Sequence, residues 1–414
     1  MQNPLSRDDV VGLDSNDPIA GLRDLFLLPQ GVIYLDGNSL GPLPAAAAAR
    51  IDEVVRAEWG RGLVRSWNDA GWIDLPVRVA AKIAPLIGAA ADEVMVADST
   101  SVNIFKLLHA ALKVRPGRSV ILSALENFGT DLYVAQGLAH LLDGGVEVRL
   151  VPTRDIAAAM NDDVAVLMLT HVDFRTGEMH DMKAVTASAH SAGAAVLWDL
   201  AHSAGAVEVD LRGCCVDFAV GCGYKYLNGG PGAPAFAFAA ARHHDVLDSP
   251  LWGWMGHRSP FDFAVSYEPA PGLDRLRVGT PPILSLAALE CGVDTISAVG
   301  VEPLREKSIA LTDLFIALVG QECGDFGFTL ASPVDAVRRG SQVSLRHQHG
   351  YAIVQALIAE GVIGDFREPD ILRFGLAPAY LRFVDVWDAV TALRRIMVER
   401  RWDRPEFRKR GRVT

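Results

Sequence analysis

The sequence lacks the features that mark membrane, secreted and nucleic-acid-binding proteins. No apolar run is long enough to cross a bilayer, and residues 1–14 lack the basic and apolar regions of a signal peptide. The chain has 39 lysines and arginines against 50 aspartates and glutamates, and its net charge of −11 argues against a general affinity for nucleic acid or anionic membranes. We therefore expect a cytoplasmic protein with no nucleic-acid or membrane partner.

Metal and dinucleotide motifs are missing as well. The five cysteines form no CxxC pair and show no metal-ligand spacing, and the histidines form no HExxH motif. His243 and His244 are interpreted as part of a solvated segment rather than as ligands. No GxGxxG motif opens a first βα turn, which argues against a Rossmann dehydrogenase. The sequence therefore predicts no metal site.

The chain does contain short, almost continuous apolar runs separated by longer helix-like segments. These runs are 94–97, 119–123, 146–151, 164–170, 195–200, 218–223 and 233–239. Strands of this kind are buried on both faces, so the pattern predicts a mainly parallel sheet of seven strands covered by helices. The last two runs are too close for a helical crossover, and we expect them to form an antiparallel pair at one edge.

The length of 414 residues predicts more than one domain. After about residue 283 the pattern changes to long amphipathic helices with strand-like runs at 341–347, 361–366 and 371–377, which suggests a small α+β domain. We expect an N-terminal segment (1–60) that joins the small domain, a large α/β domain (61–285) and a small α+β C-terminal domain (286–414).

Polar and aromatic residues follow the predicted strands at their carboxyl ends, where open parallel sheets bind ligands. In chain order they are Ser99 and Thr100, Phe128 and Asp131, Thr170, Asp199 and His202, and Lys225. Each has an ordinary structural explanation, such as a helix cap, a core ring or, for Lys225, a solvated turn. Together they suit one ligand: a phosphate at a helix start, a flat ring, a ring nitrogen that needs a carboxylate, and an aldehyde that needs an amine. These are the parts of pyridoxal 5′-phosphate.

Longer motifs point to a family. They are YLDGNSLGPLP (34–44), FGTD (128–131), LTHVDFRTGEMHDM (169–182), WDLAHSAG (198–205), GCGYKYLNGGPG (221–232), GWMGH (253–257) and RVGTPPILSL (277–286). Over nearly its whole length the chain resembles the fold-type I pyridoxal phosphate enzymes of the aminotransferase class V group, and within that group the kynureninase family. The resemblance implies an aspartate aminotransferase-like fold and a homodimer with shared active sites.

The resemblance also implies how the cofactor is held. Lys225 would bind pyridoxal phosphate as a Schiff base and later move the substrate proton, Asp199 would pair with the pyridine nitrogen, and Phe128 would stack on the ring. The phosphate, the ring oxygen and the surrounding network would be held by Ser99, Thr100, Asp131, Thr170, His202 and Tyr224. Trp254 and Thr280 would complete the cofactor site from the partner subunit.

For the substrate, the resemblance implies L-kynurenine, hydrolysed at Cβ–Cγ to anthranilate and L-alanine in tryptophan degradation. Arg373 would bind the α-carboxylate with two parallel hydrogen bonds, helped by Asn38, while Tyr224 would serve in proton transfer. Trp67, Gly279 and Thr280 would shape the pocket for the aromatic ring. Small Gly279 and apolar Trp67 resemble bacterial enzymes that prefer L-kynurenine, but 3-hydroxykynurenine stays open as a substrate.

Two other functions remain open at this point. A cysteine desulfurase or selenocysteine lyase shares the fold and the Asp, His and Lys pattern, but it would need a cysteine on a mobile loop near the substrate. Cys291 and Cys323 lie in segments without such a motif, and Cys222 is expected to be a buried structural thiol. A catalytically silent relative that only binds a partner is the second alternative. Loss of Lys225 or Asp199 would indicate it, and both are present.

Overall fold

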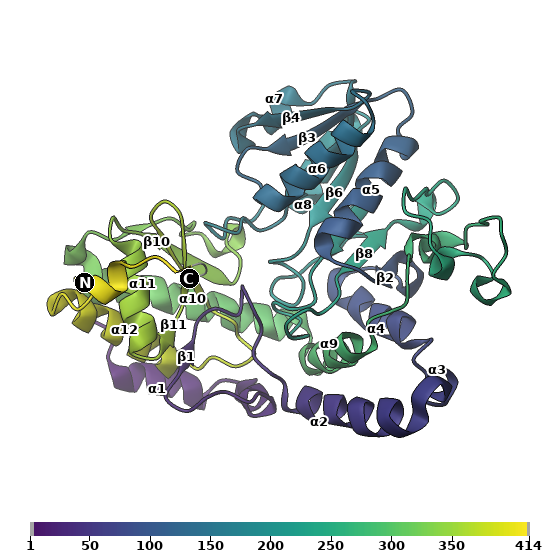
Figure 1. Cartoon of the computed structure of the whole chain (residues 1–414). Helices are drawn as coiled ribbons and strands as arrows, with labels where there is room; N and C mark the ends of the chain where they lie inside the picture. The colour runs from purple at the N-terminus through teal and green to yellow at the C-terminus, as the bar shows by residue number, and fades with distance from the viewer. Residues whose placement is uncertain (1–3, 412–414) are drawn as a thin grey trace.

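The computed structural model describes residues 4–411. Its larger part is built on a seven-stranded central sheet, and its smaller part, at the left of Figure 1, contains both ends of the chain. Residues 1–3 and 412–414, which belong to the predicted outer segments, lie outside the described residues. The predicted domain limits at residues 60 and 285 stay a prediction.

The predicted mainly parallel sheet of seven strands is confirmed. Its strands are β2 (Val94–Val96), β3 (Val120–Ala124), β4 (Glu147–Val151), β5 (Val164–Thr170), β6 (Ala195–Asp199), β7 (Phe218–Gly221) and β8 (Phe236–Ala239). They lie in the order β2-β8-β7-β6-β5-β3-β4, and β8 runs antiparallel to both of its neighbours. The antiparallel pairing of the last two predicted runs is confirmed, but its place at an edge is wrong because β2 pairs with β8 and covers it.

Helices cover both faces of the central sheet because its strands are apolar on both sides. The helices of this part are α2 (Ala45–Glu53), α3 (Ser66–Asp69), α4 (Leu75–Ile83), α5 (Thr100–Val114), α6 (Gly129–Leu141), α7 (Ile156–Ala159) and α8 (Met182–Ser191). Leu107 of α5 and Leu138 of α6 belong to one buried cluster, whereas Ala189 of α8 belongs to the other. Ser99 caps α5 and Asp181 caps α8, as the sequence predicts.

The chain from residue 283 onward forms long helices and a small antiparallel sheet. The helices are α9 (Ile283–Ser297), α10 (Val301–Cys323), α11 (Gly350–Ala359), α12 (Phe383–Val398) and α13 (Pro405–Arg408). The C-terminal sheet consists of β9 (Thr329–Leu330), β10 (Gln342–Arg346), β12 (Asp365–Arg367) and β13 (Ile371–Gly375), in the order β12-β13-β10-β9. Near the N-terminus, β1 (Ile33–Tyr34) pairs with β11 (Val362–Ile363), and α1 (Arg7–Ser15) packs against α12. Helix α1 therefore lies against the C-terminal helix α12.

Between residues 4 and 411, no single helix combines the length and the apolarity that a membrane span requires. One sharply bent pair, Ile283–Ser297 with Val301–Phe326, meets both criteria when the two helices are taken together.

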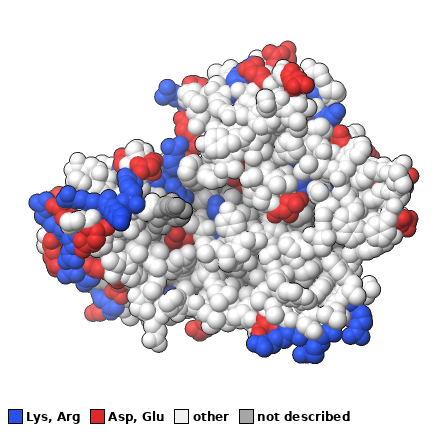
Figure 2. All heavy atoms as spheres, viewed as in Figure 1, with Lys and Arg blue, Asp and Glu red and all other residues white. Residues whose placement is uncertain are grey.

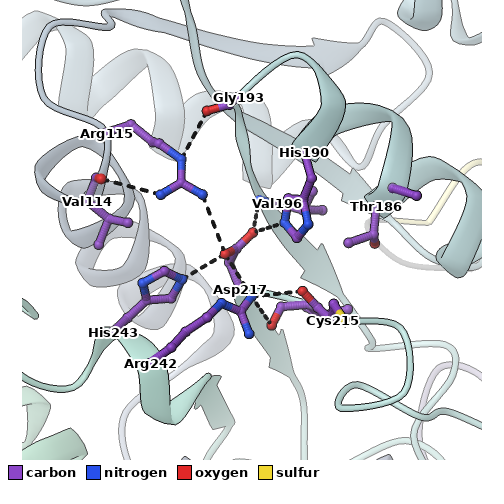
Figure 3. Close-up of polar contacts among 12 residues, drawn as sticks. Val114, Arg115, Thr186, His190, Gly193, Val196, Cys215, Asp217, Arg242 and His243 are labelled. Carbon is purple, nitrogen blue, oxygen red and sulfur yellow. Dashed lines mark hydrogen bonds and ion pairs between the residues drawn. The ribbon is translucent and has the colours of Figure 1, made fainter.

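A buried carboxylate connects several segments at the amino ends of the central strands. Asp217 directly precedes β7 and is completely buried. Its Oδ1 accepts hydrogen bonds from Nε2 of His243 at 2.7 Å and from Nη2 of Arg242 at 2.8 Å. Its Oδ2 accepts hydrogen bonds from Nε2 of His190 at 2.7 Å and from the backbone N–H of Val196 at 2.9 Å. Figure 3 shows these groups converging on the one carboxylate from different elements.

The interpretation of His243 and His244 as a solvated segment is therefore wrong. His243 is buried, and its ring stacks on Phe218 with the ring centroids 5.3 Å apart. His244 is partly buried and contacts the carbonyl oxygen of Ala239 at 3.0 Å. The sequence pattern gave no sign of this because the partner, Asp217, lies 26 positions earlier in the chain.

Candidate active site

Lys225 lies in a turn just after β7, and its amine contacts a buried histidine. The distance from Nζ to Nε2 of His202 is 2.9 Å. Burial, followed by the charge of Lys225, holds the pKa of His202 well below its usual range, so the neutral ring accepts the hydrogen bond from the amine. The ring of Tyr224 lies 5.9 Å from the same Nζ. His202 therefore gives the amine of Lys225 a defined direction.

The N-terminal motif DGNSLG packs directly against this turn. The backbone N–H of Gly41 donates to the carbonyl oxygen of Tyr224 at 2.8 Å. A Cβ added at Gly41 would lie 2.4 Å from the carbonyl oxygen of Lys225, so the two segments can meet this closely only at a glycine. Two motifs that are far apart in the sequence thus form one site.

Two buried carboxyl groups lie beside the lysine. Asp199 ends β6, and its Oδ1 accepts the backbone N–H of Ala201 at 2.8 Å. Burial raises the pKa of Asp199, although the charge of Lys225 opposes the shift. Burial and then the charge of Asp199 raise the pKa of Asp131 well above its usual value. Both carboxyl groups would be stabilised in their charged form by a nearby positive charge, and a protonated ring nitrogen would supply one.

The residues predicted to contact the phosphate and the ring differ in their solvent exposure. Ser99 is exposed, and its Oγ accepts the N–H of Val102 at 3.4 Å at the start of the 15-residue helix α5, where Thr100 is the first residue. Phe128 is 41% exposed, so one side of its ring is free to stack on a ligand. Thr170, in contrast, is buried and donates from both its N–H and its Oγ1 to Oδ1 of Asn127 at 2.7 Å.

Arg373 lies next to the segment that contains Asn38. Both are buried, and Ser39 follows Asn38 and accepts a hydrogen bond from Nη2 of Arg373 at 2.7 Å. Arg373 also forms a buried ion pair with Asp365. Within the described part of the chain, Nδ2 of Asn38 has a single, long contact of 3.4 Å, to Oε1 of Gln342.

Four predicted residues are not brought to Lys225 within the chain. Trp67 packs edge-on against Trp72 with the ring centroids 5.8 Å apart. Gly279 and Thr280 line a small cavity of 70 Å³ together with Asp98, the residue before Ser99. Trp254 is 37% exposed and stacks on Phe263. Among residues 4–411, none of these contacts involves Lys225 itself.

A larger cavity lies between the strand ends and the C-terminal sheet. It has a volume of 370 Å³ and is lined by Asn127, Thr170, Thr176 and Ile371, among others. This volume lies in the range of small-molecule sites. Among the described residues, no group of three or more His, Cys, Asp and Glu side chains is arranged to hold a metal ion.

Sequence relatives decide the family. A protein of Burkholderia mallei (strain ATCC 23344) named kynureninase is 54% identical over 414 residues, covering 99% of this chain and 100% of its own. Kynureninase of Pseudomonas fluorescens is 51% identical with the same coverage. The chain belongs to the kynureninase family. The family descriptions that match are "Kynureninase C-terminal domain" for residues 304–393 and "DegT/DnrJ/EryC1/StrS aminotransferase family" for residues 76–217.

Solved structures share the fold of this kynureninase family member at much lower identity. The apo cysteine desulfurase of Thermococcus onnurineus NA1 superposes with a TM-score of 0.78 at 17% identity, covering 92% of this chain and 98% of its own. The cysteine desulfurase CsdA of Escherichia coli gives a TM-score of 0.75 at 19% identity, with the same coverage. The predicted fold-type I architecture is thereby confirmed.

Several polar residues of the site were not predicted from the sequence. Asn127 donates to Asp131 at 3.3 Å and accepts from Thr170, so it connects two predicted residues. Gln342 contacts Asn38 and donates to the carbonyl oxygen of Phe174 at 3.2 Å. Asn127 directly precedes the motif FGTD (128–131), where an amide beside the named residues could have been noticed. Gln342 lies in a C-terminal strand that carries no motif, so its place follows only from the fold.

Asp36, in the same motif as Asn38, is expected to reduce stability at neutral pH. Burial, and after it the charge of Asp365, raises the pKa of Asp36 to about 7. Because the folded state holds this proton more tightly than the unfolded state, stability falls as pH rises from about 4 to about 7. We expect Asp36→Asn to raise the melting temperature by on the order of 2 °C at pH 8 and to change it little at pH 4. Thermal unfolding followed by circular dichroism at both values checks this, and an equal shift at both would contradict it.

Proposed function

We propose that this chain hydrolyses L-kynurenine at its Cβ–Cγ bond, giving anthranilate and L-alanine, with pyridoxal 5′-phosphate bound at Lys225. Its membership of the kynureninase family, at 54% identity over 99% of the chain, makes it a hydrolase of carbon–carbon bonds that depends on this cofactor. The observation that carries the proposal is this relationship together with the Lys225 amine held on neutral His202.

The residues around Lys225 suit the parts of pyridoxal phosphate. We assign Asp199, beside Asp131, to the ring nitrogen because two buried carboxyl groups gain from a protonated nitrogen between them. We assign the phosphate to Ser99 and Thr100 at the start of α5, because free backbone N–H groups and the positive end of the helix dipole attract anions. When bound, pyridoxal phosphate accepts the electron pairs that bond cleavage leaves on carbon, which no side chain can do.

The side chains near the amine then supply binding and proton transfer. Lys225 would hold the cofactor at its aldehyde carbon and, as a free amine, would remove and return the proton at Cα of the substrate. Burial holds the pKa of the Tyr224 hydroxyl above its usual value. Tyr224 therefore keeps its proton at neutral pH and can donate it to oxygen as water adds to the side-chain carbonyl of the substrate. Phe128 covers one face of the ring, and Arg373 with Asn38 binds the α-carboxylate.

We infer that the active form is a homodimer in which Trp254 and Thr280 of each subunit complete the site of the other. Within one chain, the ring of Trp254 packs on Phe263, and Thr280 lines the small cavity that also contains Asp98. Exposed aromatic side chains gather around Trp254: Trp252 is 65% exposed, Phe261 60% and Phe263 75%. The lobe that carries them, at the right of Figures 1 and 2, has a mostly uncharged surface, which suits contact with a second subunit.

The shared site predicts complementation between two defective variants. Lys225→Ala removes the amine from the site of its own subunit, while Trp254→Ala damages the site of the other subunit. In a mixed dimer both defects therefore fall in the same site, and the second site keeps both Lys225 and Trp254. We expect each variant alone to lose most activity, and a mixture that has been unfolded and refolded together to regain part of it. The control is the same treatment of each variant by itself. No gain in the mixture, with dimers present in sedimentation experiments, would contradict shared sites.

The five cysteines are all free, which suits the reducing cytoplasm that we propose as the location. They also bear on the alternative function. A cysteine desulfurase needs a reactive, mobile thiol near the substrate, but Cys222 and Cys323 are buried. The exposed Cys215 lies beside Asp217, at the amino end of β7 and away from Lys225, where its carbonyl oxygen accepts a hydrogen bond from Nη2 of Arg242 at 2.8 Å.

The proposal is tested by offering the holoenzyme L-kynurenine, 3-hydroxykynurenine and L-cysteine separately. We expect anthranilate from L-kynurenine and little or no sulfide from cysteine. We propose that L-kynurenine is preferred over its 3-hydroxy form, with Trp67 and Gly279 near the aromatic ring. A higher kcat/KM for cysteine than for both kynurenines would reject the proposed function in favour of a desulfurase.

A further inference from the structure

Almost all N–H groups of the Arg373 guanidinium donate hydrogen bonds within the protein. Its Nε donates to Oδ1 of Asp365 at 2.7 Å, and its Nη2 donates to Oδ2 of Asp365 and to Oγ of Ser39, the latter at 2.7 Å. Its Nη1 donates to the carbonyl oxygen of Phe174 at 2.7 Å. Both Arg373 and Asp365 are 2% exposed.

Arg373 has few N–H donors left for a ligand. A guanidinium carries five N–H groups, and the four hydrogen bonds above leave one, on Nη1. Two parallel hydrogen bonds to a substrate carboxylate, as the sequence led us to expect, would require Asp365 or Ser39 to be displaced. A second donor must otherwise come from another residue, and Asn38, predicted at the same carboxylate, has an amide nitrogen with only the long contact to Gln342.

Asp365 is itself held firmly in its charged form. Burial would raise its pKa, but hydrogen bonds and charges from Arg373 and Arg367, with a hydrogen bond from Ser39, lower it instead. Arg367 lies 2.8 Å from Oδ2, and Oγ of Ser39 lies 2.9 Å from it. Asp365 and Arg373 face each other on the paired strands β12 and β13, so the pair is built into the sheet.

The Arg373 cluster is connected to the cofactor site by two short routes. Ser39 lies two residues before Gly41, which donates to the carbonyl oxygen of Tyr224 next to Lys225. Phe174, whose carbonyl oxygen accepts from Arg373, has its ring edge-on to Phe128 at 5.1 Å between centroids. Arg373 is therefore linked both to the Lys225 turn and to Phe128.

We propose that Asp365 and Ser39 are positioning residues that hold Arg373 in one orientation, in which it presents a single Nη1–H to the α-carboxylate of the substrate. Neither residue touches the reacting atoms. Asp365 acts by fixing the side of the guanidinium opposite to the substrate, and Ser39 by holding Nη2. This inference rests on the proposed function and identifies residues that set the affinity for an α-amino acid.

The test compares Asp365→Asn and Ser39→Ala with the wild-type holoenzyme and with Asp370→Asn as a matched control. Asp370 forms an ion pair with Arg346 in the same part of the C-terminal sheet, but it is 34% exposed. We expect Asp365→Asn to raise KM for L-kynurenine by about 10- to 100-fold, since a hydrogen bond to a charged group is disturbed, while kcat falls much less. Ser39→Ala should raise KM by about 3- to 10-fold, and Asp370→Asn should leave it unchanged.

A binding measurement separates positioning from general damage. L-Alanine carries the α-carboxylate, whereas the decarboxylated amine of kynurenine does not, and both change the absorbance of the bound cofactor when they bind. In Asp365→Asn and in Ser39→Ala we expect weaker binding of L-alanine and unchanged binding of the amine. Equal weakening of both ligands in Ser39→Ala, or an unchanged KM in a folded Asp365→Asn, would overturn the inference.

The outcomes for the two proposals are distinct. If the wild-type protein forms no anthranilate, the proposed function fails, and the L-alanine titration still decides the role of Asp365. If the wild-type protein is active and the L-alanine titration does not respond to either variant, the function stands and the positioning role is wrong.

Discussion

Lys225→Ala should lower the rate of anthranilate formation by at least about 1,000-fold while leaving the fold intact. The amine has no substitute in the site, because its hydrogen-bond partner His202 is a buried imidazole, which cannot form a Schiff base with an aldehyde. Lys225 is not part of the core, so its loss removes chemistry rather than packing. The rate is measured by anthranilate fluorescence, and the fold by circular dichroism and the melting temperature.

Lys183→Ala is the matched control for this variant. Lys183 is an exposed lysine on α8, and its loss should leave both activity and stability close to those of the wild-type protein. If Lys225→Ala kept a tenth or more of the activity with the fold unchanged, Lys225 would not be the residue that holds the cofactor.

Asp217→Asn should produce the largest loss of stability, about 3 kcal/mol or more, with no direct effect on the active site. The carboxylate is completely buried and accepts hydrogen bonds from His190, Arg242 and His243, so an amide would remove the buried negative charge and set an N–H donor against donors that had bonded to the carboxylate. Chemical unfolding of the holoenzyme in urea measures the change. Asp388→Asn, which alters the exposed ion pair with Arg7, should cost less than about 1 kcal/mol and serves as the control.

The Asp217 effect should also depend on pH with a definite sign. Burial alone would raise the pKa of Asp217, but hydrogen bonds from His190 and His243, together with Arg242, outweigh it and hold the pKa well below its usual value. A carboxyl group with a lowered pKa stabilises the fold above its unfolded pKa, about 4, and loses this contribution as pH falls. The difference between wild type and Asp217→Asn should thus be largest at neutral pH and shrink below pH 4. A constant difference would show that packing, rather than charge, is responsible.

The central sheet and the positions of the ligand residues could be predicted from the sequence because both follow from local patterns. Apolar runs identify buried parallel strands, and residues that follow such strands meet at one edge whatever the exact order of the strands. That is why Asp199, His202 and Lys225 could be placed together before the fold was known. The outer position of β2 could not, because strand order in the sheet depends on contacts over long distances in the sequence.

The same reasoning explains what the sequence did not reveal about the substrate side. Asp365 and Gln342 are placed at the site by the pairing of β10, β12 and β13. Which residues face each other across those strands cannot be predicted from a local sequence pattern. The burial of His243 depends on Asp217 in the same way. Trp254 and Thr280 are assigned to the site of a second subunit, and Trp67 and Gly279 to the pocket for the aromatic ring, and these roles stay a prediction.

The most direct test of the central claim is to follow both products while pyridoxal phosphate is titrated into the apo protein. A known amount of protein is mixed with increasing cofactor and excess L-kynurenine, and anthranilate and alanine are each quantified. We predict that activity rises with the cofactor until one molecule is bound per chain, that an absorbance band of a Schiff base appears in parallel in the absence of substrate, and that anthranilate and alanine form in equal amounts. Product formation that does not depend on pyridoxal phosphate, or anthranilate without an equal amount of alanine, would contradict the account.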